Sequence, residues 1–303
     1  MKIYDCFTFY NEINILKLRL KLLNSVINKF VIVESNKTQN GVLKPFTFEK
    51  VKYEFSEYLD KIIYIKAEDP PDIINDKWAI EHYQRNCIMK GLINCSAEDL
   101  IIISDIDEFI NPDIFTKLNQ LKICSINNNY GIKNSLRQFL KLLGTNKKLI
   151  RNCSVENALE YIPITIQQDF FYYYMNNINL SKKWEGPVMV KFKNFMMPQK
   201  LRDLRQILPF IKTTDNFKTG WHFSYLGGKE KVKEKLKTIV EGNELIIPKK
   251  YISIDNFISD YLNKGLDIWN RDKMKFINPS EIGIKNVDLI HENFPEYFND
   301  NKV

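Results

Sequence analysis

Blocks of apolar and polar residues follow one another along the first 110 residues and predict alternating strands and helices. Short runs rich in β-branched and aromatic residues predict strands at 3–9, 30–35, 61–67 and 100–104. Between these runs, apolar residues recur at helical spacing over 11–29 and 78–93. Strands that alternate with helices are typical of parallel βαβ units, so the chain is predicted to be an α/β protein with a mostly parallel central sheet.

The pattern is less regular after residue 110. Further strands are predicted at 164–175, 188–192 and 221–226, and a charged amphipathic helix follows two glycines at 227–240. The polar stretch 124–161 is a candidate insertion, and 240–303 is expected to be a mostly helical C-terminal extension. With no internal repeat or obvious linker, we expect a single domain over 1–303.

Three carboxylates follow the buried strand at 100–104: Asp105, Asp107 and Glu108. Ligands of open α/β sheets bind at the carboxyl ends of the strands, and Asp105 and Asp107 lie at such an end. Two carboxylates two residues apart can bind Mg²⁺ or Mn²⁺ while a substrate phosphate fills other positions. The structural alternative is a solvated turn in which an Asp caps the next helix.

Three other segments carry candidate chemistry. Arg85, on the predicted helix before the acidic strand, suits recognition of phosphate, although a surface ion pair explains it equally well. His222, one of three histidines, could be a further metal ligand or a structural residue. In the segment 182–187, Trp184 could stack on a sugar while Glu185 accepts a hydroxyl proton, or the segment could be an ordinary turn.

Composition narrows these expectations only a little. The net charge of +7 would suit phosphate-bearing ligands, but no dense Lys/Arg run favours nucleic acid. The five cysteines form no C-x-x-C pair, which indicates free thiols in a reducing compartment. No signal peptide or apolar run of about 18 residues is present, so we expect a cytoplasmic protein, at most peripheral to a membrane.

Taken together, the motifs resemble glycosyltransferase family 17, the family of β-1,4-mannosyl-glycoprotein β-1,4-N-acetylglucosaminyltransferase. The segments that carry the resemblance occur in the family's order: YDCFTFYNEINILKLRL, FVIVESNKTQNG, QRN, ISDIDEF, FYYYMN, KWEGP and GWHFSYLGG. It extends from about residue 2 to about residue 237 and fades across 124–161 and in the tail. Eukaryotic members have an N-terminal membrane anchor, so the chain looks like a bacterial or viral member.

The resemblance implies a GT-A type fold with a Rossmann-like nucleotide-binding half, and an inverting, metal-dependent transfer from a UDP-sugar, with GlcNAc favoured, to a glycan hydroxyl. Asp107 would hold Mn²⁺ or Mg²⁺ directly, and Asp105 would contact the donor ribose or a metal-bound water. His222 would be the C-terminal metal ligand. The residues implied near the donor nucleotide are Asn11, Glu12, Glu34 and Arg85.

The general base is expected between the Asp-x-Asp motif and His222. Glu185 is the first choice, because Trp184 and Gly186 offer a stacking surface and backbone room, and Asp169 is the second. Asp203, Asp215 and, just past His222, Glu230 are weaker candidates.

Two other functions are compatible with these motifs. A metal-dependent nucleotidyltransferase acting on sugar phosphates would also pair carboxylates at a strand end, but it would release pyrophosphate. A catalytically inactive carbohydrate-binding domain would keep the aromatic residues and tolerate loss of Asp107.

Overall fold

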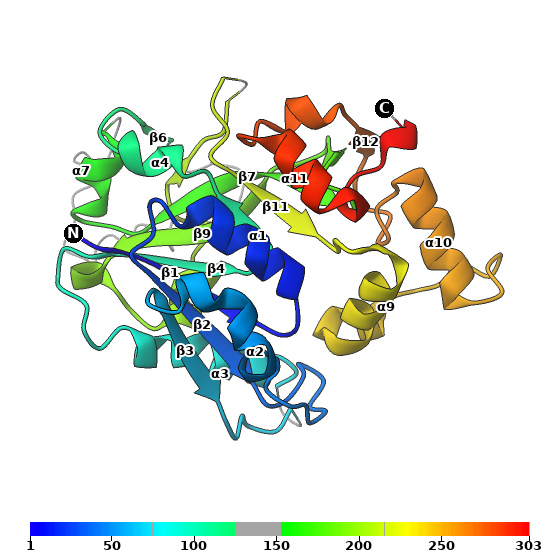
Figure 1. Ribbon diagram of the computed structural model, residues 1–303, viewed down its shortest axis with the longest axis horizontal. Coiled ribbons are helices and arrows are strands. Elements are labelled where there is room, and N and C mark those ends of the chain that lie inside the picture. The colour runs from blue at the N-terminus through cyan, green and yellow to red at the C-terminus, as the bar shows by residue number, and fades with distance from the viewer. Residues whose placement is uncertain (74–75, 125–152, 215, 303) are drawn as a thin grey trace.

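The structure, a computed structural model, describes residues 1–73, 76–124, 153–214 and 216–302 as one large sheet flanked by helices (Figure 1). The main run of paired strands is β12 (Met274–Phe276), β8 (Asn177–Asn179), β7 (Ile164–Tyr172), β9 (Trp184–Lys191), β4 (Leu100–Asp105), β1 (Ile3–Phe9), β2 (Lys29–Ser35) and β3 (Ile62–Ala67). Beside it lie β5 (Glu108–Ile110), β6 (Ile123–Cys124), β10 (Phe210–Ile211) and β11 (Gly220–Ser224).

The helices include every one expected in the first 110 residues. Those of α type are α1 (Ile13–Leu23), α2 (Thr47–Val51), α3 (Ala79–Asn86), α4 (Asp113–Thr116), α7 (Val155–Leu159), α8 (Pro198–Asp203), α9 (Gly228–Thr238), α10 (Ile254–Lys264) and α11 (Val287–Asn293). Those of 3₁₀ type are η1 (Lys52–Tyr58), η2 (Cys87–Gly91), η3 (Phe192–Asn194), η4 (Val240–Glu244), η5 (Pro279–Ile282), η6 (Pro295–Tyr297) and η7 (Asp300–Lys302). None of the helices in the described ranges is long and apolar enough to cross a membrane.

The α/β class is confirmed, and the longest run of parallel strands lies in the N-terminal half. Strands β3, β2, β1 and β4 run parallel in that order, as consecutive βαβ units require. On the far side of β4 the pairing becomes antiparallel, first with β9 and then between β9 and β7. The sheet is therefore partly antiparallel, although β10 and β11 each run parallel to β7.

Two predicted helices are shorter than the sequence pattern suggested. Helix α1 ends at Leu23, although the apolar spacing continued to residue 29, where β2 begins. The helix predicted over 78–93 is α3 followed by the tighter turns of η2. At the end of η2, a Cβ on Gly91 would lie 2.5 Å from Val31 Cγ1, so this glycine lets the segment pack closely against β2.

Most of the candidate insertion, residues 125–152, lies outside the described residues, as does the weaker base candidate Asp215. The proposed extension after residue 240 contains α10 and α11 together with β12 and short 3₁₀ turns. Helices α9 and α10 pack on each other through Val232, Leu236, Phe257 and Leu262. This second hydrophobic cluster lies beside the main core and includes aromatic residues of β7, so it fixes the C-terminal helices to the sheet.

One fully buried cation joins β1, α1 and the acidic turn after β4. Arg19 makes two hydrogen bonds to the carboxylate of Asp5, at 2.8 and 2.7 Å, and one to Ser104 Oγ at 2.7 Å. Its Nη1 also donates to the backbone carbonyls of Asp105, Ile106 and Glu108. Because these three turn carbonyls accept hydrogen bonds from a guanidinium that Asp5 holds in place, the acidic turn has a defined shape.

We predict that Arg19→Met lowers the free energy of unfolding by about 3–5 kcal/mol, because it leaves the carboxylate of Asp5 buried without a counter-charge. The measurement is urea unfolding followed by circular dichroism. Lys17→Met is the matched control on the same helix, since its pair with Glu54 is partly exposed and should be worth about 1 kcal/mol or less. Equal destabilisation by the two variants would contradict the role given to Arg19.

Candidate functional site

A cavity of about 610 Å³ opens at the carboxyl ends of the parallel strands. Thr8 at the end of β1, Ser35 at the end of β2 and Asp105 at the end of β4 all line it. Strand order reverses between β1 and β4, and open α/β sheets bind their ligands at such a switch point. The position of the cavity agrees with the strand-end site expected from the sequence.

The first aspartate of the acidic turn is held between two arginines. Asp105 Oδ1 accepts from Arg85 at 2.8 Å, and Oδ2 accepts from Arg202 at 2.7 Å. Burial by itself would raise the pKa of Asp105, but the charges of Arg202 and Arg85 more than offset this and hold the pKa well below its usual range. Asp105 is therefore a carboxylate whose two oxygens are already engaged.

Glu108 is the buried centre of the same network. Its fully buried carboxylate accepts from both terminal nitrogens of Arg202, from Trp184 Nε1 at 2.6 Å and from the backbone N–H of Asp105 at 3.1 Å. A Cβ on Gly186 would lie 2.8 Å from Glu108 Oε1, so the glycine of the KWEGP segment leaves room for this carboxylate. The KWEGP segment thus packs against the carboxylate of Glu108 through Trp184 and Gly186.

Asp107, in the turn between β4 and β5, and His222, on β11, converge at the cavity. Asp107 Oδ1 lies 3.6 Å from His222 Nε2, and its Oδ2 accepts from Lys235 of α9 at 2.8 Å. Burial would raise the pKa of Asp107, whereas Lys235 and His222 lower it, and the result lies well below the usual range. His222 reaches this place because Gly220 lets β11 approach β5: a Cβ there would lie 2.3 Å from the carbonyl oxygen of Phe109.

Asp107 and His222 fit a divalent cation as a pair of ligands. Ligands of one metal lie about 3 Å apart when each is about 2.0–2.3 Å from it, and the imidazole nitrogen and carboxylate oxygen are close to that spacing. In the described part of the chain, no group of three or more His, Cys, Asp or Glu could hold a metal. Mg²⁺ and Mn²⁺ commonly use one or two protein ligands and complete their shells with phosphates and water.

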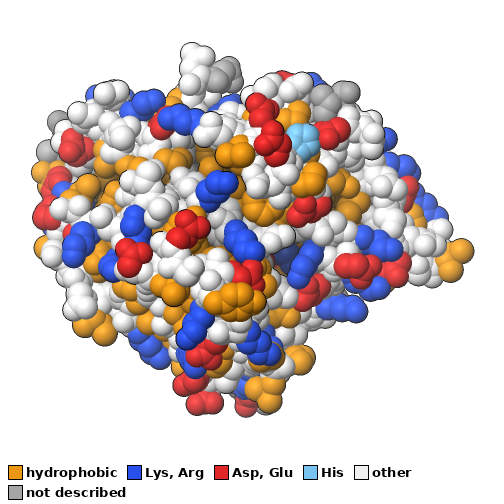
Figure 2. Space-filling view, viewed as in Figure 1, with side chains coloured by type: hydrophobic (Ala, Val, Ile, Leu, Met, Phe, Trp, Pro, Cys, Tyr) orange, Lys and Arg blue, Asp and Glu red, His pale blue; other side chains and the backbone are white. Residues whose placement is uncertain are grey.

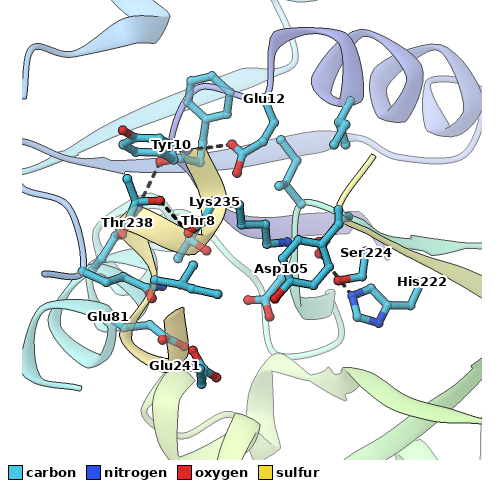
Figure 3. A pocket seen from close by; sticks show the side chains of 18 of the residues that line it. Thr8, Tyr10, Glu12, Glu81, Asp105, His222, Ser224, Lys235, Thr238 and Glu241 are labelled. Carbon is cyan, nitrogen blue, oxygen red and sulfur yellow. Dashed lines mark hydrogen bonds and ion pairs between the residues drawn. The ribbon is translucent and has the colours of Figure 1, made fainter. Parts of the chain in front are cut away.

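The metal-binding role predicted for Asp105 does not follow from this geometry. Both of its oxygens face guanidinium groups, and Lys235 occupies the second oxygen of Asp107. Figure 3 shows Asp105, Lys235 and His222 turned into the same space, with Glu12 above them. Asp107 and His222 are the two predicted residues that could hold the ion directly.

The residues expected near the nucleotide separate into two groups. Asn11, Glu12 and Arg85 line the cavity. Glu34 does not line it: this fully buried carboxylate accepts from Lys44 Nζ, the backbone N–H groups of Thr47 and Phe48, and Tyr64. Glu34 therefore anchors the segment before α2, and its acceptor sites are not available to a ligand.

Neither residue predicted as the base lines the cavity. Trp184 and Phe170 do line it, and successive side chains of a strand point to opposite faces, so Glu185 and Asp169 lie on the other face of the sheet. Asp169 forms ion pairs with Lys183 and Lys218, and Glu185 lies opposite Gln167 of β7. The weaker candidates Asp203 and Glu230 have exposed side chains.

The sequence patterns missed two cations of the site. Arg202, next to the weaker base candidate Asp203 in the segment LRDLRQIL, binds Asp105 and Glu108. Lys235 lies on the charged helix α9, where nothing in the pattern of lysines separates it from the lysines around it. Lys235 can be assigned to the site only when it is known that this turn of α9 faces Asp107. Charges of both signs are mixed over the molecular face in Figure 2.

Comparison with known proteins finds a family match in the N-terminal half. Residues 1–143 match the family model of glycosyltransferase family 17. The family resemblance seen in the sequence is thereby confirmed over this range, which contains β1 to β4, Arg85 and the acidic turn. His222, Lys235 and Arg202 lie beyond it.

Curated relatives agree with the family 17 match. The chain is 29% identical over 126 residues to the β-1,4-mannosyl-glycoprotein 4-β-N-acetylglucosaminyltransferases of Rattus norvegicus and Homo sapiens. The similar stretch covers 39% of this chain, 23% of the rat protein and 24% of the human one, so it spans less than a quarter of those relatives. The mouse protein of the same name is 28% identical over the same length.

We predict that Arg202→Met destabilises the protein by about 3–5 kcal/mol, because Glu108 would stay buried without a cation. Thermal and urea unfolding measure the loss. Adding Glu108→Gln to Arg202→Met should restore much of it, since the neutral amide needs no counter-charge. Arg205→Met is the control, because no described carboxylate forms an ion pair with Arg205. A double variant no more stable than Arg202→Met would contradict the assignment.

Proposed function

We propose that this protein transfers a sugar from a nucleoside-diphosphate sugar to a hydroxyl group of a glycan acceptor. The observation that carries the proposal is the convergence of Asp107 and His222 on a cavity at the carboxyl ends of β1 and β4. The match of residues 1–143 to glycosyltransferase family 17 supports the same class of reaction. A UDP-sugar, with GlcNAc favoured, is the proposed donor because the similar curated proteins are named N-acetylglucosaminyltransferases.

The proposed donor site uses the charges around the acidic turn. A Mn²⁺ or Mg²⁺ ion held by Asp107 and His222 would act as a Lewis acid and neutralise the diphosphate as it leaves. Arg205, which also lines the cavity, forms no ion pair with a described carboxylate, so its charge is available to the diphosphate. Arg85 and Arg202 have their charges balanced by Asp105, Glu81 and Glu108, and they keep the turn in place.

The proposed reaction inverts the configuration at the anomeric carbon in one displacement. The acceptor oxygen forms the new bond to that carbon, the bond to the diphosphate breaks, and a carboxylate takes the hydroxyl proton. Of the carboxylates that line the cavity, Glu12 and Glu241 have pKa values raised by burial. Glu12 is close enough to Lys235 and Asp107 for their charges to influence its pKa, so we propose Glu12 as the base in place of Glu185.

A donor-hydrolysis screen tests the function. Purified protein is incubated with Mn²⁺ and a panel of UDP- and GDP-sugars, and free nucleoside diphosphate and pyrophosphate are both measured. Release of UDP from one donor, without pyrophosphate, is expected. Pyrophosphate release from UTP and a sugar 1-phosphate would show a nucleotidyltransferase instead. Binding of glycans without turnover of any donor would indicate an inactive carbohydrate-binding domain.

We predict opposite effects of two substitutions on binding of Mn²⁺ to the protein without donor. Asp107→Asn should abolish binding, because it removes the charged ligand. Lys235→Met should tighten binding by about tenfold or more, because two unit charges 4 Å apart interact by about 4 kcal/mol at an effective dielectric constant of 20. The free Mn²⁺ signal in electron paramagnetic resonance gives both affinities.

Lys233→Met is the matched control for Lys235→Met, because Lys233 lies on the same helix and pairs with Asp255. It should leave the affinity for Mn²⁺ unchanged. Unaltered Mn²⁺ binding by folded Asp107→Asn would refute the ligand assignment.

We predict that Glu12→Gln lowers the transfer rate by about 10²-fold or more, the scale expected for lost general-base catalysis. The raised pKa of Glu12 means that its carboxyl stays protonated above the usual range for Glu. The rate should therefore rise with pH as the group ionises, and this acid limb should disappear in Glu12→Gln. Glu185→Gln is the control. Should Glu185→Gln lose activity while Glu12→Gln keeps it, the base would be Glu185.

A further inference from the structure

One wall of the cavity is a continuous series of aromatic rings. The centroids of Trp184 and Phe170 are 5.1 Å apart, those of Phe170 and Tyr172 4.8 Å, and those of Tyr172 and Tyr225 5.9 Å. Trp269 Nε1 then lies 3.4 Å from the hydroxyl of Tyr225. All five side chains line the cavity, and we call them the aromatic wall.

The aromatic wall begins at the proposed reaction centre. The imidazole of His222 stacks on Phe170 with a centroid distance of 4.6 Å and an interplanar angle of 5°. Phe170, Tyr172 and Tyr225 are buried, whereas Trp184 and Trp269 at the two ends of the wall are partly exposed. A molecule bound along the wall would contact these two indoles, and its Trp184 end would lie beside His222, whose ring centroid is 4.5 Å away. Flat apolar rings with polar edges suit the faces of sugar rings, which present C–H groups between hydroxyls.

A buried aspartate shapes the loop at the far end of the wall. Asp267 accepts from the backbone N–H of Trp269 at 3.0 Å and of Arg271 at 2.9 Å. Asn270 between them has φ of +53°, and its side chain accepts from Tyr261 at 2.8 Å. This turn directs both Trp269 and Arg271 to the cavity, since both line it.

One residue of the aromatic wall, Tyr225, has an unfavourable backbone conformation. Tyr225 has φ of +61°, and Tyr173, whose ring packs against it, has φ of +62°. Bulky residues rarely adopt left-handed conformations, and such strain persists where surrounding contacts fix it. The second hydrophobic cluster supplies those contacts through Phe257 and Ile268.

Arg271 presents hydrogen-bond donors that the protein leaves largely unused. Its Nη2 donates to the hydroxyl of Tyr172 at 3.1 Å, and its guanidinium lies 5.4 Å from the ring centre of Trp269. The carboxylate of Asp267 is 3.6 Å from Nε and already accepts the two backbone N–H groups. Among the described residues, nothing accepts from Nη1. The planar guanidinium of Arg271, with free donors and next to the indole of Trp269, suits a carboxylate or phosphate group.

We propose that the aromatic wall is the acceptor subsite and that its acceptor is an anionic glycan, whose carboxylate or phosphate group binds Arg271. The inference rests on the proposed function, because it takes the site of transfer to be Asp107 and His222. It adds to that function the charge of the acceptor.

The test uses three labelled disaccharides that differ only in the terminal sugar: glucose, glucuronic acid and glucose 6-phosphate. Binding to the whole protein is measured by fluorescence anisotropy with Mn²⁺ and UDP present. We expect at least one acidic sugar to bind about tenfold or more tightly than glucose, the scale of a hydrogen bond to a charged group. Which acid is preferred distinguishes a carboxylate from a phosphate acceptor.

Two variants locate the effect. Arg271→Gln should remove the preference for the acidic sugar and leave binding of the glucose form unchanged. Trp269→Ala should weaken binding of all three sugars. Lys275→Gln, an exposed charge on neighbouring β12, should change none of them. UDP affinity should stay within about twofold in every variant, which separates the aromatic wall from the donor site.

Equal binding of the neutral and acidic sugars by the unchanged protein, or no binding of any, would overturn the inference. Retention of the acidic preference by folded Arg271→Gln would overturn it as well. Failure of the proposed function has a different signature, because UDP would then not bind and no UDP-sugar would be hydrolysed, whatever the result with the disaccharides.

Discussion

The buried ion pair between Arg19 and Asp5 is the interaction on which the site depends. A guanidinium and a carboxylate with no exposed surface are stable only when nearly all of their hydrogen bonds are made, and here the remaining donors of Arg19 bind Ser104 and the carbonyls of the acidic turn. The same contacts join β1, α1 and β4. The turn therefore cannot move without leaving donors of a buried guanidinium without acceptors.

Charge balance then decides what each acid of the turn can do. Arg85 and Arg202 bind Asp105, and Arg202 also binds Glu108, so the oxygens of both carboxylates are engaged within the protein. Asp107 has one lysine on one oxygen and an imidazole near the other, an arrangement that an incoming cation could rearrange. Three carboxylates within four residues thus have different roles, because different helices place cations beside them.

The site is assembled from both halves of the chain. The family 17 match ends at residue 143, before β11 brings His222, α9 brings Lys235, and the loop around Asp267 brings Trp269 and Arg271. Helix α9 also reaches across to the first half, where Asn11 donates to Glu234 at 2.5 Å and Asn40 donates to the carbonyl of Lys237 at 2.8 Å. The N-terminal half supplies the strand ends, and the C-terminal half closes the cavity over them.

The sequence by itself determined the parallel half and the end of the sheet where the site lies. Short β-branched runs between helical patterns leave little choice of element, and Asp105 and Asp107 follow such a run directly. It could not determine which carboxylates face the cavity. Strands β7 and β9 are buried on both faces, so no alternation of polar and apolar residues marks the side to which Asp169 or Glu185 points. Only the tertiary structure decided that, by placing Phe170 and Trp184 toward the cavity, and only packing of α9 selected Lys235 from a row of similar lysines.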